Sequence, residues 1–466
     1  MNELGTALRE LAREAAAPTS GDPARVWAAG RSRVRRRRVG AAVVVIVLGL
    51  IGYAGVSRPM PQIVMPAGPV HAPAIPENIY GPNRFLAGVS KTGAPGRLAV
   101  IASTTQNDAN RYYGRWFGIT ATTGRYVALD LPGRATDSRM WLSPDGDRIA
   151  YVITGPTKKK SYGKTTPDLE GGPLPLAPPV GIGVYDTRDG SVIHYRTLTD
   201  MGWGALDETS LSWTDDTTLI FAYDVAVAEN SATAGGSWLW HPGSDQPRRI
   251  SDTDSGDASD ARQYIAGFPA SVVVRSTGDG PPYAVVDSDG KPTGRTISYP
   301  VDGRGGNTLS VSGNRVLLVG FTAGSTRSKI ELGEQAEGSS TVSFTPITTL
   351  TFPGFLGWRS SSTVLVDGQE GEVINGELEP KDLEQGRLCL YSLDVDTKHL
   401  TRLGTVHDSI DQETLQAADS LLSEPLVHGR KPPNAIEAFC YPLLVVGLAL
   451  AGIAAFLEVR RRRRRA

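Results

Sequence analysis

The chain of 466 residues contains only two cysteines, Cys389 and Cys440. Cys389 falls in a strand-like run and Cys440 in an apolar one, so we expect no disulfide between them and a domain that folds on its hydrophobic core. Linear catalytic motifs are also missing: there is no G-x-S-x-G elbow, no H-E-x-x-H zinc motif and no P-loop. The six histidines are scattered. The sequence therefore predicts no catalytic residues and no cofactor.

No part of the chain has equal numbers of basic and acidic residues, although the net charge of the whole chain is only -1. Residues 1–38 hold nine arginines against four acidic residues, and residues 458–466 hold six arginines against one glutamate. The remaining middle has 33 basic and 44 acidic residues. Two basic ends around an acidic centre are typical of a membrane topology, and we expect no nucleic-acid partner.

Two long runs contain no charged residue. Residues 39–56 form 18 such residues directly after four arginines, and residues 439–457 form 19 just before six arginines. Eighteen helical residues cover about 27 Å, enough to cross the hydrocarbon core. Because basic clusters stay in the cytoplasm, both termini are predicted to be cytoplasmic and residues of about 60–435 extracytoplasmic, in a protein of the cell membrane. A cleaved signal peptide and a C-terminal sorting signal are the competing interpretations, but 38 residues precede the first run and no LPXTG pattern precedes the second.

The middle of the chain repeats a strand–turn–strand unit. Copies begin near Leu142, Leu211, Leu309 and Leu356, with a weaker copy at Ile265. A second hairpin with a turn rich in Asp, Gly or Thr alternates with them, as in VYDTRDGSVIHY and LYSLDVDTKHLTRL. Hairpin pairs every 45–70 residues predict an all-β fold, a β-propeller of about six, or seven, four-stranded blades flanked by two transmembrane helices. Tryptophans recur at blade-like positions, and core packing is the favoured interpretation, with a ring around the propeller mouth as the alternative; they are Trp141, Trp213, Trp238, Trp240 and Trp358.

The segment WLSPDGDRIAYV, residues 141–152, resembles the repeat of TolB-type and WD-repeat-like propellers. The resemblance covers about residues 85–405, and the other copies keep the spacing but lose the Pro-Asp-Gly turn. The whole chain is similar to membrane-anchored propeller proteins of actinobacteria. The resemblance implies a fold and a location, and it supplies no catalytic residues.

These patterns together predict seven segments. They are a cytoplasmic Arg-rich amphipathic segment (1–38), a transmembrane helix (39–56), a Pro-rich linker (57–84), an extracytoplasmic β-propeller (85–405), a helical or linker segment (406–437), a transmembrane helix (438–457) and a cytoplasmic poly-Arg tail (458–466).

Three segments are candidate binding sites. The acidic run with Asp252, Asp254, Asp257 and Asp260 is a weak calcium candidate, since Ca²⁺ takes six to eight oxygens, but Gly256 and Gln263 fit a calcium loop poorly. A solvated loop is the competing interpretation.

The insertion with Lys158, Lys159 and Lys160 leads into a Pro-rich tract, and long loops often carry binding. A merely solvated insertion explains it equally well. In the cytoplasmic segment, Leu4, Leu8 and Leu11 share a helical face that suits a protein partner or the membrane surface.

The main functional hypothesis is a non-enzymatic binding, sensory or protein-interaction module. Its extracytoplasmic domain would bind a protein or envelope ligand, and its N-terminal helix would bind a cytoplasmic protein. The alternatives are a structural subunit of an envelope complex, and an exported propeller enzyme, a hydrolase or lyase, with acidic residues from separate blades converging in the central channel.

Overall fold

The computed structural model describes residues between 72 and 432 of the chain. Within these limits it leaves out 83–85, 87, 105–114, 135–138, 156–178, 197–205, 229–230, 252–263, 268–270, 276–282, 288–291, 298–306, 322–326, 337–338, 340–341, 352, 370, 375–376, 381–387 and 408. No helix in the described part is long and apolar enough to cross a bilayer. Both predicted spans, 39–56 and 438–457, lie outside the described residues.

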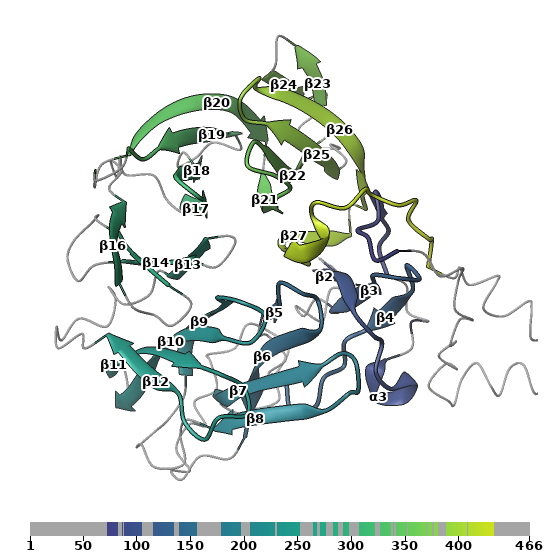
Figure 1. Cartoon of the computed structure of the whole chain (residues 1–466). Helices are drawn as coiled ribbons and strands as arrows, with labels where there is room; N and C mark the ends of the chain where they lie inside the picture. The colour runs from purple at the N-terminus through teal and green to yellow at the C-terminus, as the bar shows by residue number, and fades with distance from the viewer. Residues whose placement is uncertain are drawn as a thin grey trace, which may run out of the picture. The chain divides into compact units, whose positions relative to one another are not determined.

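The described chain folds into antiparallel sheets that form a β-propeller (Figure 1). Five of the sheets are four-stranded blades. From the innermost strand outward they are β27 (Ile410–Ala417), β2 (Leu98–Thr104), β3 (Phe117–Thr120) and β4 (Tyr126–Ala128); β5 (Met140–Leu142), β6 (Arg148–Thr154), β7 (Pro179–Asp186) and β8 (Val192–Arg196); β9 (Leu206–Trp213), β10 (Leu219–Ala228), β11 (Ser231–Trp240) and β12 (Arg248–Ser251); β13 (Tyr264–Gly267), β14 (Ser271–Arg275), β15 (Tyr283–Val286) and β16 (Pro292–Ile297); and β17 (Asn307–Ser312), β18 (Arg315–Phe321), β19 (Arg327–Glu334) and β20 (Ser343–Thr351).

A further sheet has five strands. It comprises β21 (Gly354–Trp358), β22 (Thr363–Gln369), β25 (Leu388–Asp394), β26 (His399–Val406) and, parallel to β26 at the outer edge, β1 (Asn78–Ile79). A separate hairpin joins β23 (Gly371–Ile374) to β24 (Glu377–Pro380), and two short helical turns are α3 (Val89–Thr92) and η2 (Asp419–Leu421). The predicted all-β propeller is thus confirmed, whereas a count of six or seven four-stranded blades and the flanking helices are not shown.

The innermost strands contact one another in a closed order, β27, β5, β9, β13, β17, β21 and back to β27. Figure 1 shows these six strands around the centre. We call the end at which each innermost strand turns into the second strand of its sheet the turn face; its turns include residues 143–147, 214–218 and 359–362. A ring of sheets buries faces that no single sheet can bury alone.

The chain closes the ring by combining its two ends in one blade. β27, from near the C-terminal end of the described chain, pairs with β2, so that Val100 lies opposite Ala417 and Thr104 opposite Ile410. This differs from the prediction, in which residues 406–437 were helical or linker. The apolar Ile410 and Leu415 fill the core as strand residues, 1% and 5% exposed.

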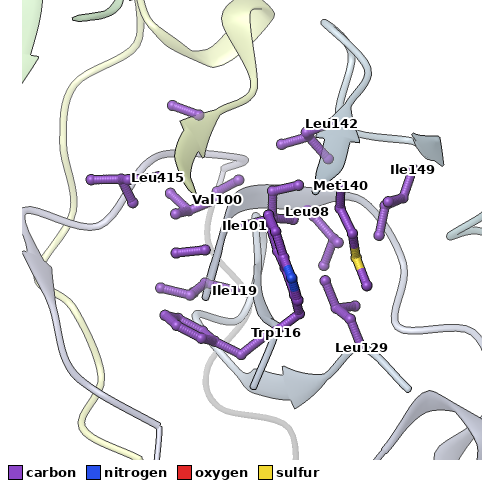
Figure 2. Close-up of a cluster of buried hydrophobic side chains, with 14 of the residues drawn as sticks. Leu98, Val100, Ile101, Trp116, Ile119, Leu129, Met140, Leu142, Ile149 and Leu415 are labelled. Carbon is purple, nitrogen blue, oxygen red and sulfur yellow. The ribbon is translucent and has the colours of Figure 1, made fainter. Parts of the chain in front are cut away.

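The core lies between neighbouring sheets. Figure 2 shows the side chains of Leu98, Ile101, Met140 and Leu415 meeting where β2, β5 and β27 come together. Of the five recurrent tryptophans, Trp213, Trp240 and Trp358 are buried, 6%, 1% and 6% exposed. Trp141 and Trp238 are only partly buried and pack against the core cluster that contains Trp213 and Trp240. Burial of aromatic and aliphatic surface of this kind is the main stabilising contribution.

Candidate functional site

The turn between β5 and β6 has the sequence Ser-Pro-Asp-Gly that the repeat pattern singled out. Ser143 Oγ donates to Asp145 Oδ1 at 2.5 Å, and the same oxygen accepts the Asp147 N–H at 3.0 Å. Gly146 has φ +77°, and a Cβ there would lie 2.1 Å from the Leu98 carbonyl oxygen, so only glycine fits. The Asp145 carboxylate therefore stabilises the turn that contains it, by accepting hydrogen bonds from two residues of that turn.

The corresponding turn between β9 and β10 presents a different carboxylate. Asp215 accepts the backbone N–H and the hydroxyl of Thr217, at 2.7 and 2.9 Å, and so organises the turn in the way Asp145 does. Its neighbour Asp216 is exposed. Partial desolvation and then the charge of Asp145 raise the pKa of Asp216, although a backbone hydrogen bond from Asp145 opposes the shift.

A third carboxylate, Asp419, begins η2 directly behind the closing strand β27. A Cβ added to Gly357 of β21 would lie 3.2 Å from Asp419 Oδ1, and the next residue, Ser420, donates its backbone N–H to the Pro144 carbonyl at 3.0 Å. Desolvation, followed by the charge of Asp216, raises the pKa of Asp419 well above its usual value. The side chain nonetheless keeps part of its surface open.

The contacts of Asp419 place it toward the axis of the ring. Gly357 belongs to the innermost strand β21, and Asp216 to the turn that follows β9. β21 and β9 are not neighbours in the closed order of innermost strands. A residue that approaches β21 and is electrostatically coupled to the turn after β9 therefore lies toward the axis, at the turn face.

Arginines connect neighbouring turns around this acidic pair. Arg97 donates from Nε to the Asp145 carbonyl oxygen at 2.6 Å and from Nη2 to Ser420 Oγ, also at 2.6 Å. Arg148 likewise donates to the Asp216 carbonyl at 2.9 Å. The positive charge of Arg97 opposes the rise in the pKa of Asp216. These bonds fix the backbone that carries both carboxylates.

Asp216 and Asp419 both have raised pKa values; the first is exposed and the second is partly open to solvent. Such a pair of carboxyl groups is suited to proton transfer. The raised pKa of Asp419 favours its protonated form, as a general acid requires, and the exposed Asp216 can meet water. No cluster of three or more metal-ligating side chains occurs among the described residues.

The residues singled out from the sequence are not part of this pair. Asp252, Asp254, Asp257 and Asp260, the lysines Lys158 to Lys160, and Leu4, Leu8 and Leu11 all lie outside the described residues. Their calcium-binding and partner-binding roles stay predictions. Sequence reasoning missed Asp216 and Asp419; the one available signal was that Asp216, like Asp145, stands three residues beyond the end of an innermost strand.

The fold and the channel define the chain as a propeller protein, and the comparison with solved structures agrees on the fold. It is similar to an oligogalacturonate lyase in complex with manganese, with 12% identity, a TM-score of 0.34, and coverage of 63% of this chain and 71% of the lyase. A prolyl endopeptidase matches with 14% identity and a TM-score of 0.36, over 62% of this chain and 38% of the peptidase. The β-propeller domain of Cps50 (Swd1) from Myceliophteria thermophila matches with 9% identity and a TM-score of 0.33, over 68% and 88%. No protein-family model and no curated protein matches the chain.

The main functional hypothesis needs correction. Propeller-containing enzymes, among them a lyase, a puromycin hydrolase and several peptidases, recur among the similar structures. These similar proteins are of the kind that the enzyme alternative names, so the non-enzymatic binding or sensory module is not carried further. At such low identity the likeness concerns the fold alone, so the chemistry has to be argued from the residues of this chain.

Proposed function

We propose that the protein is an enzyme of the hydrolase or lyase class, with Asp419 and Asp216 as its proton-transferring pair at the turn-face end of the channel. The observation that supports it is the raised pKa of Asp419, which results from desolvation and from the charge of Asp216. Burial and a neighbouring like charge both favour the protonated form of a carboxyl group. The two acids therefore have different roles.

The chemistry best suited to such a pair is cleavage of a glycosidic bond. The Asp419 carboxyl gives its proton to the oxygen of the leaving sugar as the bond to the anomeric carbon breaks. In hydrolysis, Asp216 takes a proton from the water that attacks that carbon, and a second water later restores the two protonation states. In a lyase acting on a polyuronide, a different bond breaks: Asp216 removes the proton from C5 of the uronic acid, the bond between C4 and the glycosidic oxygen breaks as a C4–C5 double bond forms, and Asp419 gives its proton to the departing oxygen. Arg97 and Arg148 hold the turns in place and do not touch the reacting atoms.

The test uses the full-length protein in detergent or nanodiscs, with soluble glycans and polyuronides as substrates. Release of reducing ends reports hydrolysis, and absorbance of the unsaturated product reports elimination. We expect Asp419→Asn and Asp216→Asn each to reduce kcat/KM about 100-fold or more. The control is Asp189→Asn, which removes an exposed carboxylate from the turn between β7 and β8. Equal activity in the wild type and both variants, or no cleavage of any substrate, would refute the proposal.

The same proposal places the enzyme at the cell membrane. We infer that residues 39–56 and 438–457 span the bilayer with both termini in the cytoplasm, because each charge-free run carries its arginines on one side. We also count the five-stranded sheet as a sixth blade, with β1 as an added outer strand, because β21 stands between β17 and β27 in the order of innermost strands. Resistance of the protein to extraction from membranes by alkaline carbonate is the expected result, and release into the supernatant would disprove the anchoring.

A further inference from the structure

The two ends of the described chain are bound to each other. Glu77 donates its backbone N–H to the Val427 carbonyl at 2.8 Å, and Val427 donates to the Ile75 carbonyl at 3.0 Å. Glycines allow the close approach: a Cβ on Gly429 would lie 2.1 Å from the Asn78 carbonyl oxygen. Segments 350 residues apart therefore leave the propeller together.

Both segments reach the turn face at the same blade. The Ala74 N–H donates to the Ala121 carbonyl at 3.0 Å, and a Cβ on Gly124 would lie 3.7 Å from the Arg430 Cβ. The turn at residues 121–124 joins β3 to β4. It lies at the turn face, because the Ala121 N–H donates to the Arg97 carbonyl while Arg97 contacts the 143–147 turn.

The chain that remains between this point and the proposed spans is short. Residues 57–71 separate it from the first span, and only residues 433–437 separate it from the second. Five extended residues reach at most about 18 Å. The second connection therefore holds this side of the propeller close to the bilayer surface.

The surface at this point carries positive charge. Arg125 follows the turn, and Arg430 and Lys431 lie on the C-terminal segment beside it; Lys431 Nζ is 5.5 Å from the centre of the Tyr80 ring. On the same segment, His428 Nδ1 lies 2.6 Å from Oε1 of the acidic Glu77. Cations close to a bilayer are attracted by anionic headgroups.

We propose that this exit sector, defined as residues 121–125 and 428–431, rests on the membrane and binds anionic lipid headgroups. The turn face then meets the bilayer at one edge, and the Asp419 end of the channel faces the gap between propeller and lipid. This orientation selects substrates that lie at the membrane surface, such as glycans attached to lipid or lying on it. The inference rests on the proposed membrane anchoring, and its substrate class rests on the proposed activity.

The test places a fluorophore on the full-length protein in vesicles of phosphatidylcholine, with and without phosphatidylglycerol, and uses headgroup spin labels as quenchers. Cys440→Ala removes one native thiol, and the other, Cys389, is fully buried. The reporter is Thr122→Cys in the exit sector. We expect strong quenching of this label, and weaker quenching when phosphatidylglycerol is left out or when Arg125→Gln and Lys431→Gln are combined.

Two matched positions serve as controls. Asn314→Cys lies in the turn between β17 and β18, on the same face but in another blade. Arg139→Cys lies at an exposed position directly before β5, at the end of that strand opposite the 143–147 turn. Both labels should be quenched much less than the label at Thr122.

Each other outcome overturns the inference. Equal quenching at Asn314 means that the whole face lies flat on the bilayer, and stronger quenching at Arg139 means the opposite orientation. No quenching at Thr122 in protein that resists carbonate extraction means that the propeller stands away from the lipid while the anchoring holds. Protein that carbonate releases shows failure of the spans themselves, and loss of activity in Asp419→Asn remains a separate measurement.

Discussion

Carboxylates of the turn face differ in what surrounds them. Asp145 and Asp215 accept hydrogen bonds within their own turns, from the Asp147 N–H and the Thr217 N–H respectively. Asp419 instead stands where protein from several sheets converges, and its pKa rises through desolvation and then through the charge of Asp216. The same type of side chain therefore orders a turn at Asp145 and Asp215, whereas at Asp419 its surroundings favour the protonated form.

The raised pKa of Asp419 predicts how stability depends on pH. Between the unfolded pKa, near 3.9, and the higher native value, the folded state binds more protons than the unfolded state. The free energy of unfolding therefore falls as pH rises through that window. Asp419→Asn removes this pH-dependent loss of stability. The thermal midpoint of the variant, relative to that of the wild type, should therefore rise as pH increases above about 4.

Thermal unfolding of the full-length protein at a series of pH values checks this prediction. Asp189→Asn, an exposed carboxylate of the same face, is the control and should follow the wild-type curve. A constant difference between Asp419→Asn and the wild type at all pH values would show that desolvation does not raise the pKa of Asp419.

At the scale of elements, the closing strand β27 is joined to its neighbour β5 through one side chain. Gln416 Oε1 accepts the Leu142 N–H at 2.9 Å, and its Nε2 donates to the Met140 carbonyl at 2.7 Å. The amide thus supplies one donor and one acceptor, as a backbone peptide group does in a sheet. Through it the innermost strands of two blades are linked.

Replacement of Gln416 by Met should keep the volume and remove both hydrogen bonds. The Leu142 N–H and the Met140 carbonyl then lose their partners, and we expect a loss of about 1–3 kcal/mol in the free energy of unfolding. Hydrogen exchange at the Leu142 amide should become faster. Arg148→Met is a matched comparison, since it removes one exposed bond from the same β5–β8 blade to its other neighbour, the β9–β12 blade; a smaller or absent effect of Gln416→Met would argue against the bridging role.

At the scale of the whole propeller, two terminal segments complete sheets built from the middle of the chain. β27 completes the blade of β2–β4, and β1 adds an outer strand beside β26, where Thr405 N–H donates to the Glu77 carbonyl at 3.1 Å. Gly404 makes this approach feasible, since a Cβ there would lie 1.6 Å from the Glu77 carbonyl oxygen. The ring is therefore secured by contacts between residues far apart in sequence.

Gly404→Ala should displace the strand β1 and cost about 1–3 kcal/mol of stability, as overpacking does. The specific readout is faster hydrogen exchange at the amides of Thr405 and His407, which bond to the β1 segment. Gly313→Ala, at a turn with φ +58° and open space around it, should cost about 1 kcal/mol and leave those two amides unchanged. Unchanged exchange in Gly404→Ala would mean that β1 is not held by this contact.

The sequence by itself determined the local hairpins. Alternating apolar residues with the Asp-Gly turn at 145–146 place β5 and β6, and with the polar turn at 395–398 place β25 and β26, where the repeat pattern predicts them, because each strand pairs with its neighbour in the chain. Only the tertiary structure decided the rest. The pairing of β27 with β2 joins residues about 300 apart, and nothing local distinguishes such a strand from a helix. Asp216 and Asp419 come from different sheets, so their electrostatic coupling and the raised pKa exist only once the ring has closed.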